Sequence, residues 1–173
     1  MVLIIQALRT RALAILLALV ATALTGCQGV SLISSYDEPT DKALTALQQS
    51  SDNFLTKMIE KAPSPDNSYD KHRGFYEDAD QQLRRIEFRV AALPKNSQTQ
   101  KLVTDIRAAI LGEGKCTAEG ASLRDLHCIP SNLSNGPSKR SLEIAKQSIN
   151  QTIHAALALE LAKKQGLESV SSK

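Results

Sequence analysis

The chain has few aromatic side chains, and this scarcity bears on its fold class. Phe, Tyr and Trp together make up 3% of the 173 residues, and there is no tryptophan. Domains rich in β-sheet normally carry many aromatic and β-branched residues, because these side chains fit a pleated surface. The abundant residues here include Ala, Leu, Gln and Lys, which are good helix formers. The composition therefore favours an all-α domain.

The common catalytic and nucleotide-binding patterns are also missing. The sequence contains no Gly-x-Ser-x-Gly, no His-Glu-x-x-His and no Gly-x-Gly-x-x-Gly. The run 112–116 resembles the end of a phosphate-binding loop, but Ala109 stands where the leading glycine belongs and Cys116 replaces serine or threonine. We therefore expect no catalytic residue, no cofactor and no enzyme activity.

Neither sign of charge dominates once the N-terminal segment is set aside. The chain has 21 Lys and Arg against 18 Asp and Glu, and removal of Arg9 and Arg11 leaves 19 basic residues against the same 18 acidic ones. A nearly neutral chain without a basic patch does not favour nucleic-acid binding.

The N-terminal segment lacks acidic residues, and its apolar run is too short to span a bilayer. Arg9 and Arg11 precede a stretch, 12–24, in which every residue is apolar or small. A spanning helix needs about 20 apolar residues, whereas a basic start followed by a shorter apolar run is typical of a signal peptide. We therefore predict a cleaved signal peptide over 1–26.

The four residues at 24–27, Leu-Thr-Gly-Cys, resemble the lipobox of bacterial lipoproteins. The resemblance implies that the thiol of Cys27 receives a diacylglycerol, that a peptidase cuts before Cys27, and that the new amine is acylated, for example with palmitate. Each buried CH₂ contributes about 0.8 kcal/mol, so three chains would form a durable anchor. Since Gln28 and not aspartate comes next, the resemblance implies the outer membrane of a Gram-negative cell.

The alternative is an ordinary secretory signal peptide. The run Ala21-Thr22-Ala23 offers a cleavage site of the Ala-x-Ala type, which would leave Cys27 as a free thiol.

After Cys27 we predict a lipidated tether over 27–36. The run SLISSYDEPTDKALTALQQSSDNFL, at 31–55, is similar to the start of small lipoproteins of Gram-negative bacteria, which share a Tyr-Asp, Thr-Asp and Leu-Thr-x-Leu-Gln series soon after the lipobox. The resemblance supports the anchored location and implies no activity.

Apolar residues recur at helical spacing in four segments of the region 37–166. These segments run from Asp37 to Pro63, from Tyr69 to Pro94, from Ser97 to Gly112 and from Ser138 to Gly166. Asp37 and Ser97 are expected as N-terminal caps, the last helix is expected to start near Ser138, and Gly112 and Gly166 are expected as C-terminal caps. We predict an all-α, up-and-down bundle of three long helices and one short helix, followed by a flexible tail, 167–173.

Several residues in these stripes carry specific expectations. Phe88 lies opposite the stripe of its helix and is expected to make a second contact with the third helix. Lys163 and Lys164 are expected to face the negative end of the last helix dipole. The sustained seven-residue spacing also permits a homo-oligomeric coiled coil.

Two cysteines remain after Cys27, in a stretch without helical periodicity. Cys116 and Cys128 lie in 112–137, which we interpret as a long loop. In an oxidising periplasm such a pair predicts one disulfide, which would stabilise the fold by about 3 kcal/mol. The alternative is a metal site made by these two thiols and His127, but ligation by adjacent residues is awkward, and we expect no metal.

Three other groups of residues have side chains capable of chemistry. The run 151–154, Gln-Thr-Ile-His, is the only near match to a di-iron Glu-x-x-His motif, and it lacks the carboxylate. His72 lies in the apolar stripe of its helix and is interpreted as a half-buried histidine with a partner, with a pH switch as the alternative. Glu77, Asp78 and Asp80 are interpreted as a solvated face on which Asp80 pairs with Arg84, although clustered carboxylates can also act as acid and base or bind a cation.

Together these patterns predict a lipoprotein that is anchored in the outer membrane, faces the periplasm and has a structural or protein-binding role in the cell envelope. Its expected partners are the membrane, through the lipid anchor, and an envelope protein. The loop 112–137 is the candidate recognition surface, because binding residues are concentrated on loops held by a rigid scaffold. The sequence does not indicate which residues would bind a partner. The alternatives are a lipoprotein that regulates or inhibits another envelope protein, and a hydrolase with an unrecognised site.

Overall fold

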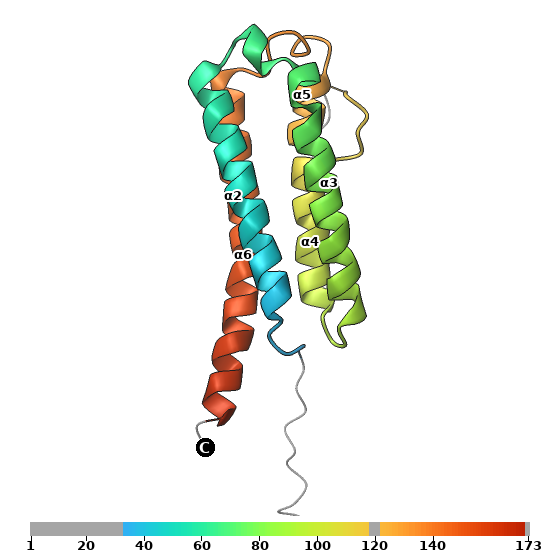
Figure 1. Ribbon diagram of the computed structural model, residues 1–173, viewed down its shortest axis with the longest axis vertical. Helices are drawn as coiled ribbons and strands as arrows, with labels where there is room; N and C mark the ends of the chain where they lie inside the picture. Colours follow the sequence, from blue (N-terminus) through green and yellow to red (C-terminus); the bar gives the residue numbers. More distant parts are fainter. Residues whose placement is uncertain (1–32, 118–121, 172–173) are drawn as a thin grey trace, which may run out of the picture. The chain divides into compact units, whose positions relative to one another are not determined.

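The computed structural model describes residues 33–117 and 122–171, with side chains up to residue 166. The predicted signal peptide, the lipidation site Cys27 and most of the tether lie outside these residues. The helices, in chain order, are α2 (Glu38–Lys61), the 3₁₀ turn η1 (Pro65–Asn67), α3 (Tyr69–Ala92), α4 (Ser97–Ile110), α5 (Leu123–Cys128) and α6 (Lys139–Ser171) (Figure 1).

Four of these helices form an up-and-down bundle. Both α2 and α4 pack against α3 and against α6. Figure 1 shows the four helices running along one another. The three long helices have 24, 24 and 33 residues, and α4 has 14. No strand occurs in the part of the chain that the structure describes. The prediction of an all-α bundle with three long helices and one short helix is therefore confirmed.

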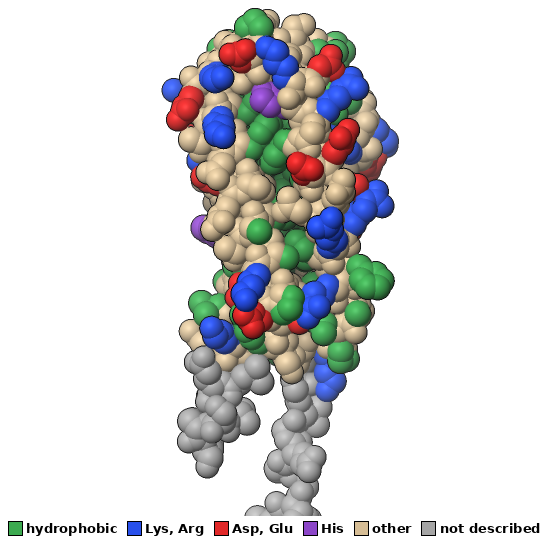
Figure 2. Space-filling model, viewed as in Figure 1, with side chains coloured by type: hydrophobic (Ala, Val, Ile, Leu, Met, Phe, Trp, Pro, Cys, Tyr) green, Lys and Arg blue, Asp and Glu red, His purple; other side chains and the backbone are tan. Residues whose placement is uncertain are grey.

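The core follows the apolar stripes of the four helices. Its largest fully buried side chains are Leu44, Leu47, Leu55, Met58, Leu83, Ile106, Ile110, Leu111, Leu123, Leu142, Ile149 and Ile153. Charged side chains of both signs are interspersed over the face seen in Figure 2, where apolar side chains appear in a hollow between α2 and α3.

Local signals at the helix ends explain most of the helix boundaries. Asp37 caps α2 by accepting a hydrogen bond from the backbone N–H of Thr40 at 3.1 Å, and Ser138 accepts one from the N–H of Ser141 at 3.2 Å before α6 begins. Gly112 has a φ of +54° after α4, and its N–H donates to the carbonyl of Ala108 at 3.1 Å. Glycine suits this left-handed position because it has no Cβ.

Three expectations about single positions were wrong. Phe88 makes no second core contact: it is 81% exposed, because it lies two residues from both Ile86 and Val90 and therefore points away from their buried face. Ser97 is the first residue of α4, and Asn96 occupies the capping position without a side-chain cap. The last helix does not end at Gly166 but continues to Ser171, because a glycine inside a helix costs only about 1 kcal/mol.

The short α4 leaves part of the bundle to be completed by the loop. At 1.5 Å per residue α4 spans about 21 Å, against about 36 Å for α3. The short helix α5 packs against both α3 and α4, and it lies beyond the end of α4, beside the part of α3 that α4 does not reach (Figure 1). None of the helices within 33–117 and 122–171 combines the length and the apolar character that a membrane crossing requires.

Candidate functional site

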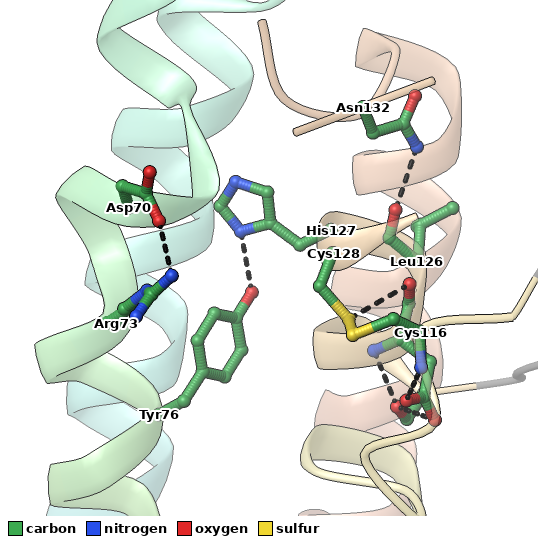
Figure 3. Close-up of a disulfide and its surroundings, with 10 residues drawn as sticks. Asp70, Arg73, Tyr76, Cys116, Leu126, His127, Cys128 and Asn132 are labelled. Carbon is green, nitrogen blue, oxygen red and sulfur yellow. Dashed lines mark hydrogen bonds and ion pairs between the residues drawn. A yellow bond between two sulfur atoms is a disulfide. The ribbon is translucent and has the colours of Figure 1, made fainter. Parts of the chain in front are cut away.

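The loop after α4 is closed by a disulfide. Cys116 and Cys128 are joined with an S–S distance of 2.03 Å, which confirms the predicted bridge (Figure 3). The loop is less irregular than expected, because it contains the six-residue helix α5, which Ser122 caps by accepting a hydrogen bond from the N–H of Asp125 at 3.0 Å. The bridge thus joins the end of α5 to the segment that follows α4.

Asp125 holds the same loop together from inside. Its carboxylate is buried, accepts a hydrogen bond from the hydroxyl of Ser122 at 2.8 Å, and accepts another from the backbone N–H of Cys116 at 3.2 Å. A Cβ on Gly112 would lie 2.2 Å from Asp125 Oδ2, so glycine is required there by close approach as well as by φ. We call the described loop residues, 112–117 and 122–137, together with η1, the tip of the bundle.

His127 connects the tip to α3. Its Nε2 lies 2.7 Å from the backbone oxygen of Asn67. Its Nδ1 lies 2.8 Å from the hydroxyl of Tyr76, as Figure 3 shows. A carbonyl only accepts hydrogen bonds, so Nε2 carries the proton and Nδ1 accepts from the Tyr76 hydroxyl. Both ring nitrogens of His127, and both sulfur atoms of the alternative metal set, are therefore already engaged.

Burial shifts the pKa values of this pair in opposite directions. His127 is 0% exposed, and the loss of solvation lowers its pKa to about 4. Burial also raises the pKa of the Tyr76 hydroxyl well above its usual value. Both groups are therefore neutral at pH 7, which suits a hydrogen-bonded connection inside the tip.

The pH dependence of stability should reveal the lowered pKa of His127. The unfolded chain binds a proton at this ring near pH 6.5, whereas the folded chain does so near pH 4. As the pH falls through this interval, stability is expected to drop by about 2–3 kcal/mol. Urea denaturation at pH 7, 5 and 4 measures the change.

In His127→Gln the drop in stability over this pH interval should disappear, since a Gln amide can still donate to Asn67 but does not titrate. His154→Gln, at an exposed histidine on α6, is the matched control and should leave the slope unchanged. The paired carboxylate of Asp37, whose pKa is lowered to about 2 by Arg89, acts mainly below pH 4 and so does not obscure the interval. An unchanged slope in His127→Gln would contradict the assignment.

The other residues singled out in the sequence are either exposed or engaged in contacts within the bundle. His72 is half-buried, and its Nε2 lies 2.9 Å from the backbone oxygen of Asp66, as the interpretation of a partnered histidine expects. Glu77 and Asp78 are exposed, and Asp80 accepts from Arg84 Nε at 2.8 Å, so this predicted ion pair is confirmed. Arg107 from α4 also binds Asp80, and these two guanidinium groups hold the pKa of Asp80 below its usual value.

A polar cavity of about 290 Å³ lies between α3 and α5. One face of α3 and the side chain of Arg124 line it, with the residues Tyr69, Arg73, Tyr76, Glu77, Asp80 and Arg124. Sequence reasoning did not single out Arg124, because it lies in the stretch without helical periodicity.

The end of the bundle opposite the tip contains a buried ionic cluster. Lys163 is 4% exposed, and its Nζ donates to Asn96 Oδ1, Thr99 Oγ1 and Glu160 Oε1 at 2.8, 2.7 and 2.6 Å. The expectation that Lys163 faces the negative end of the helix dipole was therefore wrong: α6 continues to Ser171, and Lys163 is paired with Glu160 in the interior. The hydroxyl of Ser34 donates to Asn96 Oδ1 at 2.7 Å, so the start of the described chain is fixed at this end.

No family model, curated protein or solved structure matches this chain. The support for a function therefore comes from the two ends of the bundle: the one where the described chain begins, which we call the base, and the tip.

Proposed function

We propose that the protein is a lipoprotein of the outer membrane, that its bundle faces the periplasm, and that it has a structural or protein-binding role in the cell envelope. The support for the anchor is the signal-peptide pattern that ends in Leu-Thr-Gly-Cys at 24–27. The support for the role is the arrangement of the domain that follows.

The main support for the proposed role is the separation of the base from the tip. The described chain begins beside the cluster of Ser34, Asn96 and Lys163, whereas α5 and η1 lie at the other end of the bundle (Figure 1). Ile33 comes only six positions after Cys27, so the base would lie within about 20 Å of the acyl chains. Within the bundle, the 24 residues of α2 separate the base from the tip by about 36 Å.

The tip has the construction of a recognition surface. It consists of loop and short helix, and the disulfide, the Asp125 carboxylate and the hydrogen bonds of His127 hold it in one arrangement. A surface that is already ordered loses less conformational entropy on binding, which favours affinity.

Site-specific crosslinking in cells tests the proposed role. A photo-reactive amino acid at the exposed position 131, in the tip, should give a discrete adduct with an envelope protein. The same amino acid at the exposed position 49, on the side of α2, is the matched control and should give none. Equal adducts at both positions, or none at either, would contradict a binding role for the tip.

A Cys27→Ser variant separates the anchor from the role. We expect it to leave the outer-membrane fraction and to lose the adduct at position 131. If deletion of the protein raises the activity of the crosslinked partner, the role is inhibitory; unchanged activity indicates a structural one. Retention of Cys27→Ser in the outer-membrane fraction would contradict anchoring through this residue.

A further inference from the structure

Arg124 has no partner for its charge within the described residues. Its Nε–H is sealed from solvent and makes no hydrogen bond, and none of the ion pairs among residues 33–117 and 122–171 involves its guanidinium. A sealed donor without an acceptor is destabilising, and such groups are rare in folded proteins. Because this N–H is closed to solvent, an oxygen supplied from outside the chain would have to approach the guanidinium through the cavity that Arg124 lines.

The loop is shaped to receive this guanidinium. A Cβ on Gly114 would lie 2.6 Å from Arg124 Nη2 and 3.1 Å from Cζ, and Gly114 has a φ of +70°. The guanidinium therefore lies against the bare backbone of Gly114. The disulfide of Cys116, two residues further on, closes the same loop, so the position of Arg124 is fixed by the tip itself.

Among the described residues that line the cavity, Arg124 is the cation without an ion-pair partner. Arg73 is paired with Asp70 at 2.7 Å (Figure 3), and Asp80 is paired with both Arg84 and Arg107. Tyr69 adds a phenol hydroxyl that makes no hydrogen bond within the described part of the chain, and it can therefore donate one. A planar guanidinium with a neighbouring hydroxyl matches the two oxygens of a carboxylate.

We propose that this cavity binds the carboxylate of an aspartate or glutamate side chain from a partner protein, with Arg124 as the anchor and Tyr69 as a second donor. The inference rests on the proposed binding role of the tip. A volume of about 290 Å³ is at the lower limit of small-molecule sites and suits a side chain. Arginine and tyrosine also dominate the energetic centres of protein interfaces.

A monoanion fits the site better than a dianion. Glu77 is one of the residues that line the cavity, and its negative charge repels a dianion more strongly than a monoanion. We therefore expect a carboxylate to bind more tightly than inorganic phosphate.

The test uses the ¹⁵N-labelled full-length chain, purified from the cells that produce it, and follows the Nε–H resonance of Arg124. The probe is the peptide N-acetyl-Gly-Glu-Gly-amide, and its Gln analogue is the control. At constant ionic strength the Glu peptide should shift the resonance in a saturable way, the Gln peptide should not, and phosphate should bind at least about threefold more weakly. Equal shifts from both peptides, no shift from either, or tighter binding of phosphate would overturn the proposal.

Two variants make the test specific. Arg124→Lys keeps the charge but loses the planar pair of donors, so the affinity, followed through the backbone amide of residue 124, should fall about tenfold or more. Arg140→Lys, at an exposed arginine of α6, is the matched control and should bind as the wild type does. Wild-type affinity in Arg124→Lys would overturn the assignment. The titration requires neither the lipid nor a partner, so its failure would leave the crosslinking at position 131 as an independent test of the proposed function.

Discussion

Replacing Lys163 by methionine is expected to lower the free energy of unfolding by about 3–5 kcal/mol, because it leaves an unpaired carboxylate in the interior. Glu160 is 0% exposed, and Lys163 is its ion-pair partner. Methionine has a similar length, so the change removes the charge with little change in volume. Equilibrium urea denaturation at pH 7 measures the effect.

Lys164→Met is the matched control, one residue along the same helix. Lys164 is exposed, and we expect its loss to change stability by no more than about 1 kcal/mol. A double variant, Glu160→Gln with Lys163→Met, should recover part of the loss, because no charge then remains buried. Equal effects of the two single lysine variants would contradict the buried cluster.

Removal of the disulfide by Cys116→Ser with Cys128→Ser is expected to destabilise the protein by about 3 kcal/mol, because the ring between these residues restricts the unfolded chain. The loss should be largest locally, since α5 has only six residues and depends on the bridge and on Asp125 for its position. Urea denaturation gives the total, and hydrogen exchange at residues 123–128 gives the local effect.

Chemical reduction of the wild type is the control for the serine substitutions. Reduced wild type and the double serine variant should have equal stability within about 0.5 kcal/mol. Two free thiols at 116 and 128 in the native protein, detected by labelling before reduction, would contradict the bridge.

The four bundle helices could be predicted because each carries a local signal over many residues. The stripe through Tyr76, Leu83 and Val90 identifies the buried face of α3, and Pro94 marks its end. The disulfide could be predicted from two cysteines and an oxidising compartment. By contrast, α5 has six residues, which is less than two turns and too short to show a periodic stripe.

The buried ionic cluster was missed although a signal was present. Leu142, Ile149, Ile153 and Ala156 are buried apolar positions of α6, and from Ile149 onward the spacing of 4 and 3 continues to Glu160 and Lys163. Two opposite charges at core positions of a stripe indicate a buried pair, but the assumption that the helix ends at Gly166 made Lys163 a last-turn residue.

The cavity at Arg124 could not be predicted from the sequence. Its lining comes from one face of α3 and from a residue 44 positions beyond Asp80, and only the folded loop brings Arg124 against Gly114. The exposure of Phe88, in contrast, could have been predicted by counting around α3 from Ile86 and Val90.

Intact-mass analysis of the native protein, extracted from outer membranes, tests the central claim most directly. We predict a chain that begins at Cys27 and carries the added mass of a diacylglyceryl group and one amide-linked acyl chain. A chain that begins at any other residue, or at an unmodified Cys27, would contradict the anchor and with it the proposed location of the domain at the membrane.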